Sequence, residues 1–372
     1  MLHFLKRVIF IPCAVYTSVI IGGGYGTGRE VVEFFSIHGA EGGLTALLTA
    51  FCVFVFVLFA TFDLARAGAH FDYRVFFKDL IGPFWWVFEL LYLALMFLVL
   101  GVVASAASQM LSDQYGLPPL IGTVATLLLI GLSLFAGRLN LERFMMVCLL
   151  AMYALFIAYF GSVMNAIEWG GNEGVAIVAE SSASDAGLAS ASWSGALYAF
   201  YNLSVVPVLL FAVRDLHSRR ESMVSAIAVS LTVLTPALLF HLSFTLAGTD
   251  VTSEAIPVYT MLGTHGAPAL VSAFVIVLII TLAQTGAGLL QGLIERVEGA
   301  RIWVQAQQTE MAPVRRVVFV VGVLSVSAIL SSVGVVALIG KGYATLAMGF
   351  GLVYVLPLIV IGIPRILKAQ AD

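Results

Sequence analysis

Long apolar runs, separated by short polar stretches, repeat along the whole chain of 372 residues. Ten runs are long enough to cross the hydrocarbon core of a bilayer, which is roughly 30 Å thick and takes about 20 helical residues. They cover residues 8–37, 43–65, 82–111, 118–136, 143–165, 193–213, 222–247, 268–295, 314–338 and 343–364. The pattern predicts an all-α integral membrane protein with ten transmembrane helices.

The composition strengthens this prediction. Hydrophobic residues make up 61% of the chain and charged residues 10%, whereas soluble domains carry roughly 25% charge. Because so few charges cannot cover a water-facing surface of this size, we expect a lipid bilayer around the protein and no nucleic acid as partner. Cys13, Cys52 and Cys148 lie in apolar runs at unrelated spacings, which indicates packing residues and no metal site.

The basic residues are distributed asymmetrically. With a cytoplasmic N-terminus, the cytoplasmic loops and helix ends hold 16 of the 18 Lys and Arg residues, and only Arg29 and Lys341 fall elsewhere. The positive-inside rule therefore favours cytoplasmic N- and C-termini in a multi-pass protein.

Ten helices divide into five and five. Because five is odd, the second half must enter the membrane with the opposite topology, as in the inverted repeats of many secondary transporters. We expect a first repeat in 1–165, an extracellular loop in 166–192 and a second repeat in 193–372. The connection 248–267 contains Ser253, placed to cap a short helix that Gly263 ends.

The first apolar run holds the most informative residues. Five glycines fall within seven positions of it: Gly22, Gly23, Gly24, Gly26 and Gly28. Each costs a helix about 1 kcal/mol relative to alanine, and non-helical backbone at membrane depth is tolerated only where it is buried in protein or lines a cavity. We therefore expect half-helices at 8–21 and 29–37 around an unwound stretch at 22–28. The alternative is a helix that ends near Gly28, followed by an amphipathic stub.

Such a break offers binding groups of both signs. The second half-helix presents free N–H groups and the positive end of its dipole to a carboxylate, and the first presents free carbonyls to a cation. An amino acid bound together with Na⁺ would use both. The first helix of the second half contains Pro207, which lacks a backbone donor. We expect a second break there, beside Asn202 and Ser204, with a simple proline kink as the alternative.

A known family has a similar first helix. The run Ile20-Ile21-Gly22-Gly23-Gly24-Tyr25-Gly26-Thr27-Gly28-Arg29-Glu30, followed by Phe34-Phe35, resembles that of the amino acid–polyamine–organocation transporter superfamily, which has the LeuT-type fold. The chain also resembles the small ten-helix YkvI-like proteins of bacteria. The resemblance implies a secondary active transporter of the bacterial inner membrane that moves a small amino acid or related zwitterion or amine by alternating access. It implies no enzyme activity, no cofactor, and a monomer or weak homo-oligomer.

The resemblance also implies where the substrate binds, which is beside the two breaks and the third segment. The residues expected there are Gly22, Gly23, Gly24, Tyr25, Gly26, Thr27, Tyr92, Phe200, Tyr201, Asn202 and Ser204.

A second motif lies in the eighth segment. In sodium-coupled members of the superfamily, this segment places hydroxyls and carbonyls against the unwound part of the first. The resemblance therefore implies a Na⁺ site whose oxygens suit a hard cation, formed by Ile21, Gly24, Thr281, Gln284 and Thr285. Gln284 stands where those members have a second hydroxyl. The alternative is a packing face formed by the small residues of the segment.

Four ionisable residues at membrane depth are further candidates, because such groups are functional hypotheses by default: Glu30, Glu33, Glu89 and His241. They are candidates for proton coupling or gating, so an H⁺-coupled transporter of the same fold is the alternative to Na⁺ coupling. Local roles are also open: Arg29 pairing with Glu33, Glu89 reaching the cytoplasmic interface, and His241 bonding a carbonyl. A transport-inactive nutrient sensor is a third possibility, whereas the HExxH and GxSxG motifs of enzymes are absent from the sequence.

Overall fold

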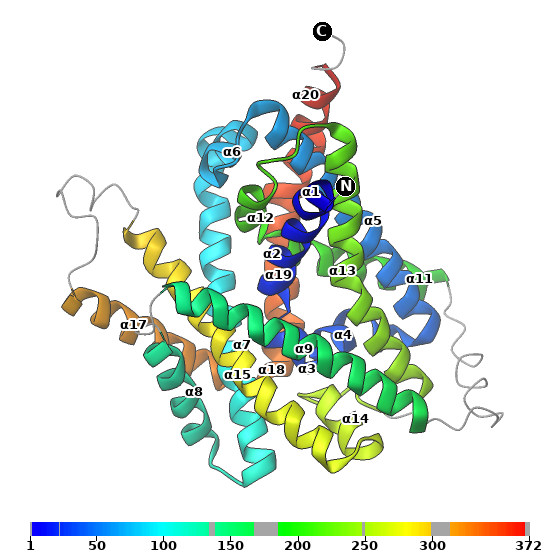
Figure 1. Cartoon of the computed structure of the whole chain (residues 1–372), viewed down its shortest axis with the longest axis vertical. Coiled ribbons are helices and arrows are strands. Elements are labelled where there is room, and N and C mark those ends of the chain that lie inside the picture. The colour runs from blue at the N-terminus through cyan, green and yellow to red at the C-terminus, as the bar shows by residue number, and fades with distance from the viewer. Residues whose placement is uncertain are drawn as a thin grey trace.

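The computed structural model describes residues 2–21, 23–133, 138–166, 185–247, 250–298 and 313–368. Within these ranges every regular element is a helix (Figure 1). Seven of the described helices are long and apolar enough to cross a membrane, or eight if one bent pair is a single span, and two shorter apolar helices accompany them. The predicted all-α membrane fold is confirmed, while the count of ten crossings stays a prediction.

The first half begins with a broken segment made of several short helices. In chain order the elements are α1 (Leu2–Leu5), η1 (Lys6–Phe10), α2 (Ile11–Ile20), α3 (Gly23–Thr27), α4 (Arg29–Phe34), η2 (Ser36–His38), α5 (Gly39–Gly68), α6 (Tyr73–Ile81), η3 (Gly82–Phe84), α7 (Trp85–Tyr115), α8 (Pro119–Ser133) and α9 (Arg138–Ala166).

The second half also begins with a broken segment. Its elements are α11 (Asp185–Leu203), α12 (Val206–Ala212), α13 (Arg219–Leu246), α14 (Pro257–His265), α15 (Pro268–Glu298), α17 (Pro313–Ser331), α18 (Val335–Ala337), η5 (Leu338–Tyr343), α19 (Ala344–Phe350), η6 (Gly351–Val355), η7 (Leu358–Gly362) and α20 (Ile363–Lys368). The division into repeats at 165 and 193 stays a prediction, and most of the predicted loop between them lies outside the described residues.

Two predicted boundaries are wrong. The ninth run ends at Ser331, because Gly334 has a φ of 91°, a left-handed conformation that favours glycine, and α18 begins directly after it. The short helix in the second long connection begins at Pro257 without a side-chain cap from Ser253, and it continues through Gly263 to His265. Proline at the first helical position, with its φ already set, starts this helix in place of a cap.

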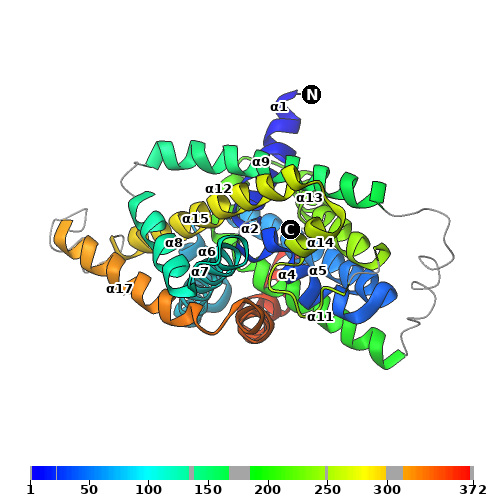
Figure 2. The ribbon, with the colours of Figure 1, turned by 90° about the horizontal axis from the view of Figure 1, so that it is seen from below.

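The helices surround the broken first segment. α2 lies between α7 and α13 in two perpendicular views (Figures 1 and 2). α5 packs against α11 and α13, and α7 packs against α8, α15 and α17. Small residues allow close approach: a Cβ on Gly195 of α11 would lie 2.0 Å from the carbonyl oxygen of Ala46 in α5. Close packing through small residues is a usual way to join helices in a membrane.

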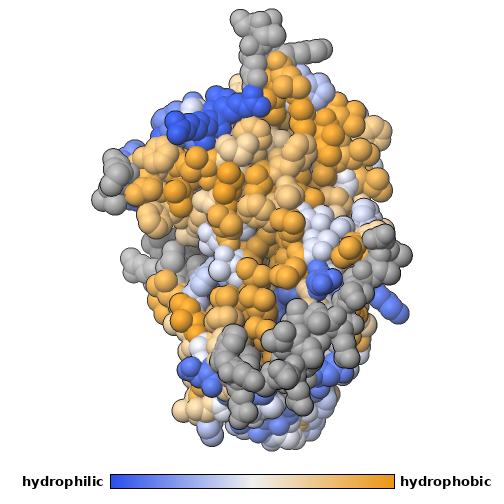
Figure 3. Space-filling view, turned by 90° about the vertical axis from the view of Figure 1, so that its right-hand side faces the viewer, coloured by the Kyte–Doolittle hydropathy of each residue, from blue (hydrophilic) through white to orange (hydrophobic). Residues whose placement is uncertain are grey.

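The outward-facing side chains are largely apolar. Hydrophobic residues cover the middle of the face seen in Figure 3, and hydrophilic residues gather toward its ends. On the peripheral helices α8 and α17, Leu120 and Ile329 are 74% and 71% exposed. An apolar surface of this extent suits lipid and not water. The first and last described helices, α1 and α20, both lie in the upper half of Figure 1.

Candidate functional site

The first segment is interrupted at two places. α2 ends at Ile20, and Ile21 leaves the helical conformation with a ψ of 86°. Gly28 has a φ of 80° and separates α3 from α4. The predicted discontinuity is confirmed, but the predicted unwound stretch 22–28 is wrong in extent, because Gly23–Thr27 is a helical turn. Gly22 itself lies outside the described residues.

Tertiary packing explains why this glycine-rich turn is helical. α3 packs between α7 and α15, and a Cβ on Gly26 would lie 2.9 Å from Leu278 Cδ1 and 3.1 Å from Met152 Cε. The glycine therefore lets α15 and α9 approach closely, and these contacts offset its low intrinsic preference for a helix.

The second broken segment bends by 61° between α11 and α12. Pro207 lies in the first turn of α12, where its missing N–H has no intrahelical partner to lose. The discontinuity is confirmed, and the simple proline kink is excluded. The two breaks are bonded to each other, because the Tyr16 hydroxyl of α2 donates to the Asn202 carbonyl oxygen at 3.0 Å. The Asn202 amide donates to the Tyr198 carbonyl of its own helix at 3.0 Å.

Both breaks face one small cavity of about 60 Å³. A buried water needs roughly 10–15 Å³ by the same measure, so the cavity has the size of a small solute of a few heavy atoms. It is lined by Val19, Ile20, Glu30, Tyr92, Leu95, Met96, Val99, Tyr201, Asn202, Val205, Thr285, Leu289 and Tyr343.

Three of the predicted substrate residues line this cavity, namely Tyr92, Tyr201 and Asn202, together with Glu30 and Thr285 from the other predicted groups. The lining residues that the sequence analysis missed, such as Met96, Leu289 and Tyr343, are apolar or aromatic positions in apolar runs. Nothing in the sequence marks them, because only the packing of α7, α15 and η5 around the breaks turns them inward.

The described lining of the cavity does not include the other predicted substrate residues. The buried Tyr25 hydroxyl donates to the Val233 carbonyl of α13 at 2.7 Å, and the Phe200 ring packs against Trp193 with centroids 6.3 Å apart. The Thr27 hydroxyl accepts from the backbone N–H of Arg29 at 3.2 Å. Ser204 is fully buried in the second break. Gly23, Gly24 and Gly26 belong to α3. Substrate contact by any of these residues stays a prediction.

Glu30 is a buried carboxylic acid at the wall of the cavity. It is 4% exposed, and its Oε2 accepts a hydrogen bond from the Tyr201 hydroxyl. No salt bridge joins Glu30 to any residue that the structure describes. The adjacent Arg29 pairs instead with Glu33, at 2.6 Å.

Two hydroxyls on α15 lack partners. The side-chain oxygens of Thr281 and Thr285, one turn apart, are buried and make no hydrogen bond. Many helix hydroxyls among the described residues instead bond a carbonyl one turn earlier, as Ser230 does to Ala226 at 2.7 Å. Gln284 between them is 3% exposed, and α15 packs against α3. Orphaned buried oxygens of this kind fit an oxygen-ligated cation. The Na⁺ site formed by these residues with Ile21 and Gly24 stays a prediction.

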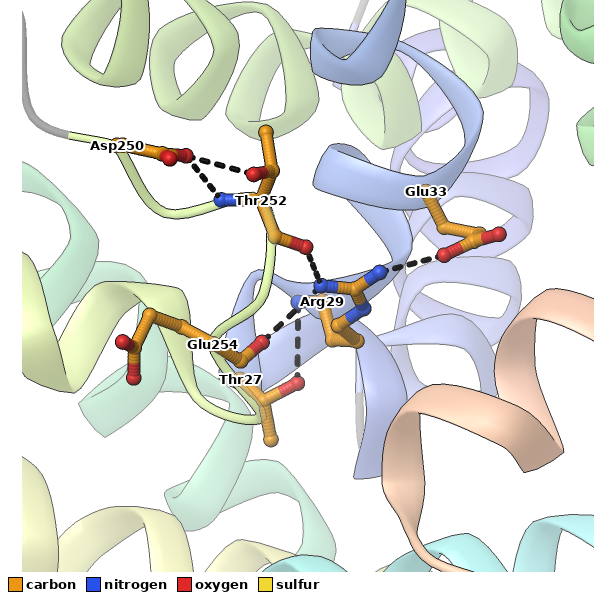
Figure 4. Close-up of polar contacts among 6 residues, drawn as sticks. All are labelled: Thr27, Arg29, Glu33, Asp250, Thr252 and Glu254. Carbon is orange, nitrogen blue, oxygen red and sulfur yellow. Dashed lines mark hydrogen bonds and ion pairs between the residues drawn. The ribbon is translucent and has the colours of Figure 1, made fainter.

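Arg29 follows the second interruption directly and binds several groups at once (Figure 4). Its guanidinium donates to the carbonyls of Thr252 and Glu254 and forms the salt bridge with Glu33. The connection before α14 is thereby held onto α4. In that connection, the hydroxyl and N–H of Thr252 both donate to Asp250, which lowers the pKa of this exposed carboxyl and keeps it ionised.

An outer pocket of about 550 Å³ lies beyond Glu33. Glu33 lines it together with Gln109 of α7 and Lys341 of η5. Glu30 and Glu33 are three positions apart on α4, so the inner cavity and the outer pocket each contain one carboxylate of the same helix.

A second charged cluster adjoins the cavity at Tyr92. The Arg296 guanidinium lies 4.2 Å from the centroid of the Tyr92 ring, and its Nε is 3.5 Å from Glu89 Oε1. The Tyr73 hydroxyl donates to the same carboxylate at 3.4 Å. Because Tyr92 lines the cavity, this cluster of Glu89, Arg296 and Tyr73 lies next to the cavity wall.

His241 lies away from the cavity. Its Nε2 is 3.1 Å from the Ala40 carbonyl oxygen, and its Nδ1 is 3.0 Å from the Ser36 hydroxyl. One neutral tautomer satisfies both bonds, with Nε2–H donating to the carbonyl and Nδ1 accepting from the hydroxyl. His241 therefore joins α13 to the start of α5, where Gly43 leaves room for the ring.

Comparison with known proteins finds no matching protein-family model and no matching curated protein. Solved structures do match. MhsT in complex with L-phenylalanine has a TM-score of 0.59 and 14% sequence identity, with 97% of each chain covered. The chain has a LeuT-type fold. A manganese transporter of Eremococcus coleocola, bound to an aromatic bis-isothiourea compound, has a TM-score of 0.53 and 13% identity, with 96% of this chain and 79% of that chain covered.

Proposed function

We propose that this protein is a secondary active transporter that moves a small amino acid, related zwitterion or amine across the bacterial inner membrane by alternating access, coupled to Na⁺. The observation that carries the proposal is the small cavity where the two broken helices meet, which has one ion-paired cluster beside Glu30 and another beside Tyr92.

Alternating access requires a central site that opens to one side at a time. We assign one closure to Arg29 with Glu33, on the same helix as Glu30, and the other to Glu89 with Arg296, beside Tyr92. Breaking either cluster alone would open one path and leave the other shut. Broken helices that pack around a midplane site are also the feature by which transporters with inverted repeats bind solutes.

The similar structures support the same general function. MhsT binds L-phenylalanine, and the other neighbour is a manganese transporter. At identities below 15%, these neighbours do not specify a substrate, so the choice of an amino acid or amine depends on the cavity size and on the first-helix motif.

Two observations favour different coupling ions. The partnerless hydroxyls of Thr281 and Thr285 favour Na⁺, because each would otherwise remain an unsatisfied buried polar group. The buried Glu30, with Tyr201 as its hydrogen-bond donor, favours H⁺ as the alternative.

The test is uptake into liposomes reconstituted with the full-length protein. Radiolabelled amino acids and amines would be offered under an inward Na⁺ gradient, under a K⁺ gradient of equal ionic strength, and under a pH gradient. We expect accumulation that needs the Na⁺ gradient; accumulation driven only by the pH gradient would select the H⁺-coupled alternative. Saturable binding without flux under any gradient would refute transport and indicate the sensor.

A further inference from the structure

Glu30 is the only side chain of ordinarily charged type among the described residues that line the central cavity. The other polar groups at the wall are the tyrosines, Asn202 and Thr285, which are neutral, and the rest is aliphatic. The charge that a ligand meets in this cavity is therefore set by one carboxyl group.

The neighbouring arginines do not neutralise this carboxyl. Arg29 is directed to Glu33 and to the carbonyls of Thr252 and Glu254 (Figure 4). Arg296 lies over the ring of Tyr92 and pairs with Glu89. Each guanidinium already has its own carboxylate, so neither compensates Glu30.

The titratable side chains that interact with Glu30 are tyrosines, which are neutral. They are Tyr25 of α3, Tyr198 and Tyr201 of α11, and Tyr343 of η5. From α13, His241 is engaged by Ser36 and Ala40. A buried carboxylate with one hydroxyl donor and no cation is costly, so Glu30 either holds a proton or pairs with a positively charged ligand.

The walls of the cavity also suit a cation. The Tyr201 and Tyr343 rings lie with centroids 4.8 Å apart, and Tyr92 forms a further aromatic wall. The faces of such rings attract ammonium groups. An acid beside aromatic rings in a cavity for a small solute is thus a recognition site for an amine.

We infer that Glu30 is the counter-charge for the ammonium group of the substrate, and that the preferred substrates carry a net positive charge. They are small amines without a carboxylate, or amino acids with a second amino group. A proton occupies the Glu30 carboxyl in the unliganded protein, and the ammonium group replaces it, so binding releases a proton. This inference rests on the proposed function and narrows its substrate class.

The test compares binding to the purified full-length protein and to Glu30→Gln, a change that keeps the shape and an acceptor for Tyr201. Glu41→Gln, at an exposed glutamate of α5, is the matched control. The probes are ethylamine, 1,4-diaminobutane, L-lysine, L-alanine and propionate. We expect the amines and L-lysine to bind the wild-type and control proteins more tightly than L-alanine does, and Glu30→Gln to weaken amine binding about tenfold or more.

Proton release gives an independent readout. In weakly buffered solution with a pH dye, amine binding to the wild-type protein should release about one proton per ligand, while Glu30→Gln should release none. Glu30→Asp, which keeps the charge, should retain amine selectivity and so distinguishes loss of charge from loss of folding.

The outcomes separate this inference from the proposed function. Unchanged amine affinity in Glu30→Gln, with uptake intact, would overturn the counter-charge role alone. Loss of pH-driven uptake with unchanged affinity would make Glu30 a proton carrier and would also overturn it. If no probe binds and no solute is taken up by the wild-type protein, the transporter proposal itself fails, and this inference fails with it.

Discussion

The partnerless hydroxyl of Thr285 leads to a prediction about stability with and without Na⁺. Replacing Thr285 by Val keeps the shape of the side chain and removes an oxygen that makes no hydrogen bond. An unsatisfied buried hydroxyl costs about 1–3 kcal/mol. Without Na⁺, Thr285→Val should therefore be as stable as the wild-type protein or more stable, by up to that amount.

With Na⁺ the difference in stability should shift toward the wild-type protein. A ligand present at about 100 times its Kd stabilises the native state by about 2.7 kcal/mol. If losing one oxygen weakens Na⁺ binding about tenfold, the same concentration stabilises the variant by only about 1.4 kcal/mol. The Na⁺-dependent gain should thus fall by roughly half.

The assay is thermal unfolding of the purified protein, followed by tryptophan emission, in NaCl and in choline chloride of equal ionic strength. Thr126→Val is the control, because the buried Thr126 hydroxyl is satisfied by the Gly122 carbonyl at 2.8 Å. The control should lose stability in both salts and keep the full Na⁺ gain. A wild-type Na⁺ gain in Thr285→Val would refute the cation site, and a loss of stability like that of the control would refute the unsatisfied hydroxyl.

Three further predictions concern the helix break and the two closures. Gly28→Ala should lower the free energy of unfolding by at least about 1–2 kcal/mol, because a φ of 80° strains any other residue. Gly322→Ala, in open space on α17, is the control and should not lower the free energy of unfolding in the same thermal unfolding assay. Arg29→Lys removes the guanidinium that binds the carbonyls of Thr252 and Glu254 and the Glu33 carboxylate. Amide hydrogen exchange in the connection before α14 should therefore quicken roughly tenfold. Unchanged exchange would mean that this connection does not depend on Arg29. Glu89→Gln should quicken amide hydrogen exchange at the start of α7. Asp79→Asn, which removes an exposed ion pair with Arg365, should leave this exchange unchanged. Equal effects of the two substitutions on exchange would argue against a closure at Glu89.

Much of the fold follows from the sequence because helices in a membrane leave a strong pattern. Apolar runs of about 20 residues have few alternatives to a transmembrane helix, since a bilayer offers no partner for unpaired backbone groups. The glycine run marked the first helix break and Pro207 marked the second, because each disfavours a continuous helix where unpaired backbone groups find no partner in lipid. The glycines did not reveal that 23–27 forms a helical turn, because the contacts of Gly26 with Leu278 and Met152 come from α15 and α9.

The candidate site is less readable from sequence. Tyr25 and Phe200 adjoin the breaks in sequence, yet the Tyr25 hydroxyl bonds α13 and the Phe200 ring packs on Trp193. Tyr343 has no motif, yet it lines the cavity. On a helix, neighbouring positions point in directions about 100° apart, so adjacency to a break does not fix which side chain faces inward.

The sequence by itself determined that this chain is an all-α membrane protein, that its first and sixth segments are broken, and that Glu30 and the two threonines are candidates for chemistry. Only the tertiary structure decided which of these groups meet. It brought Glu30, Tyr201 and Thr285 to one cavity, and directed Arg29 to Glu33 and the loop carbonyls. The physical reason is that helix formation depends on local backbone bonding and apolar length, whereas the pairing of a buried charge depends on which helices pack beside it.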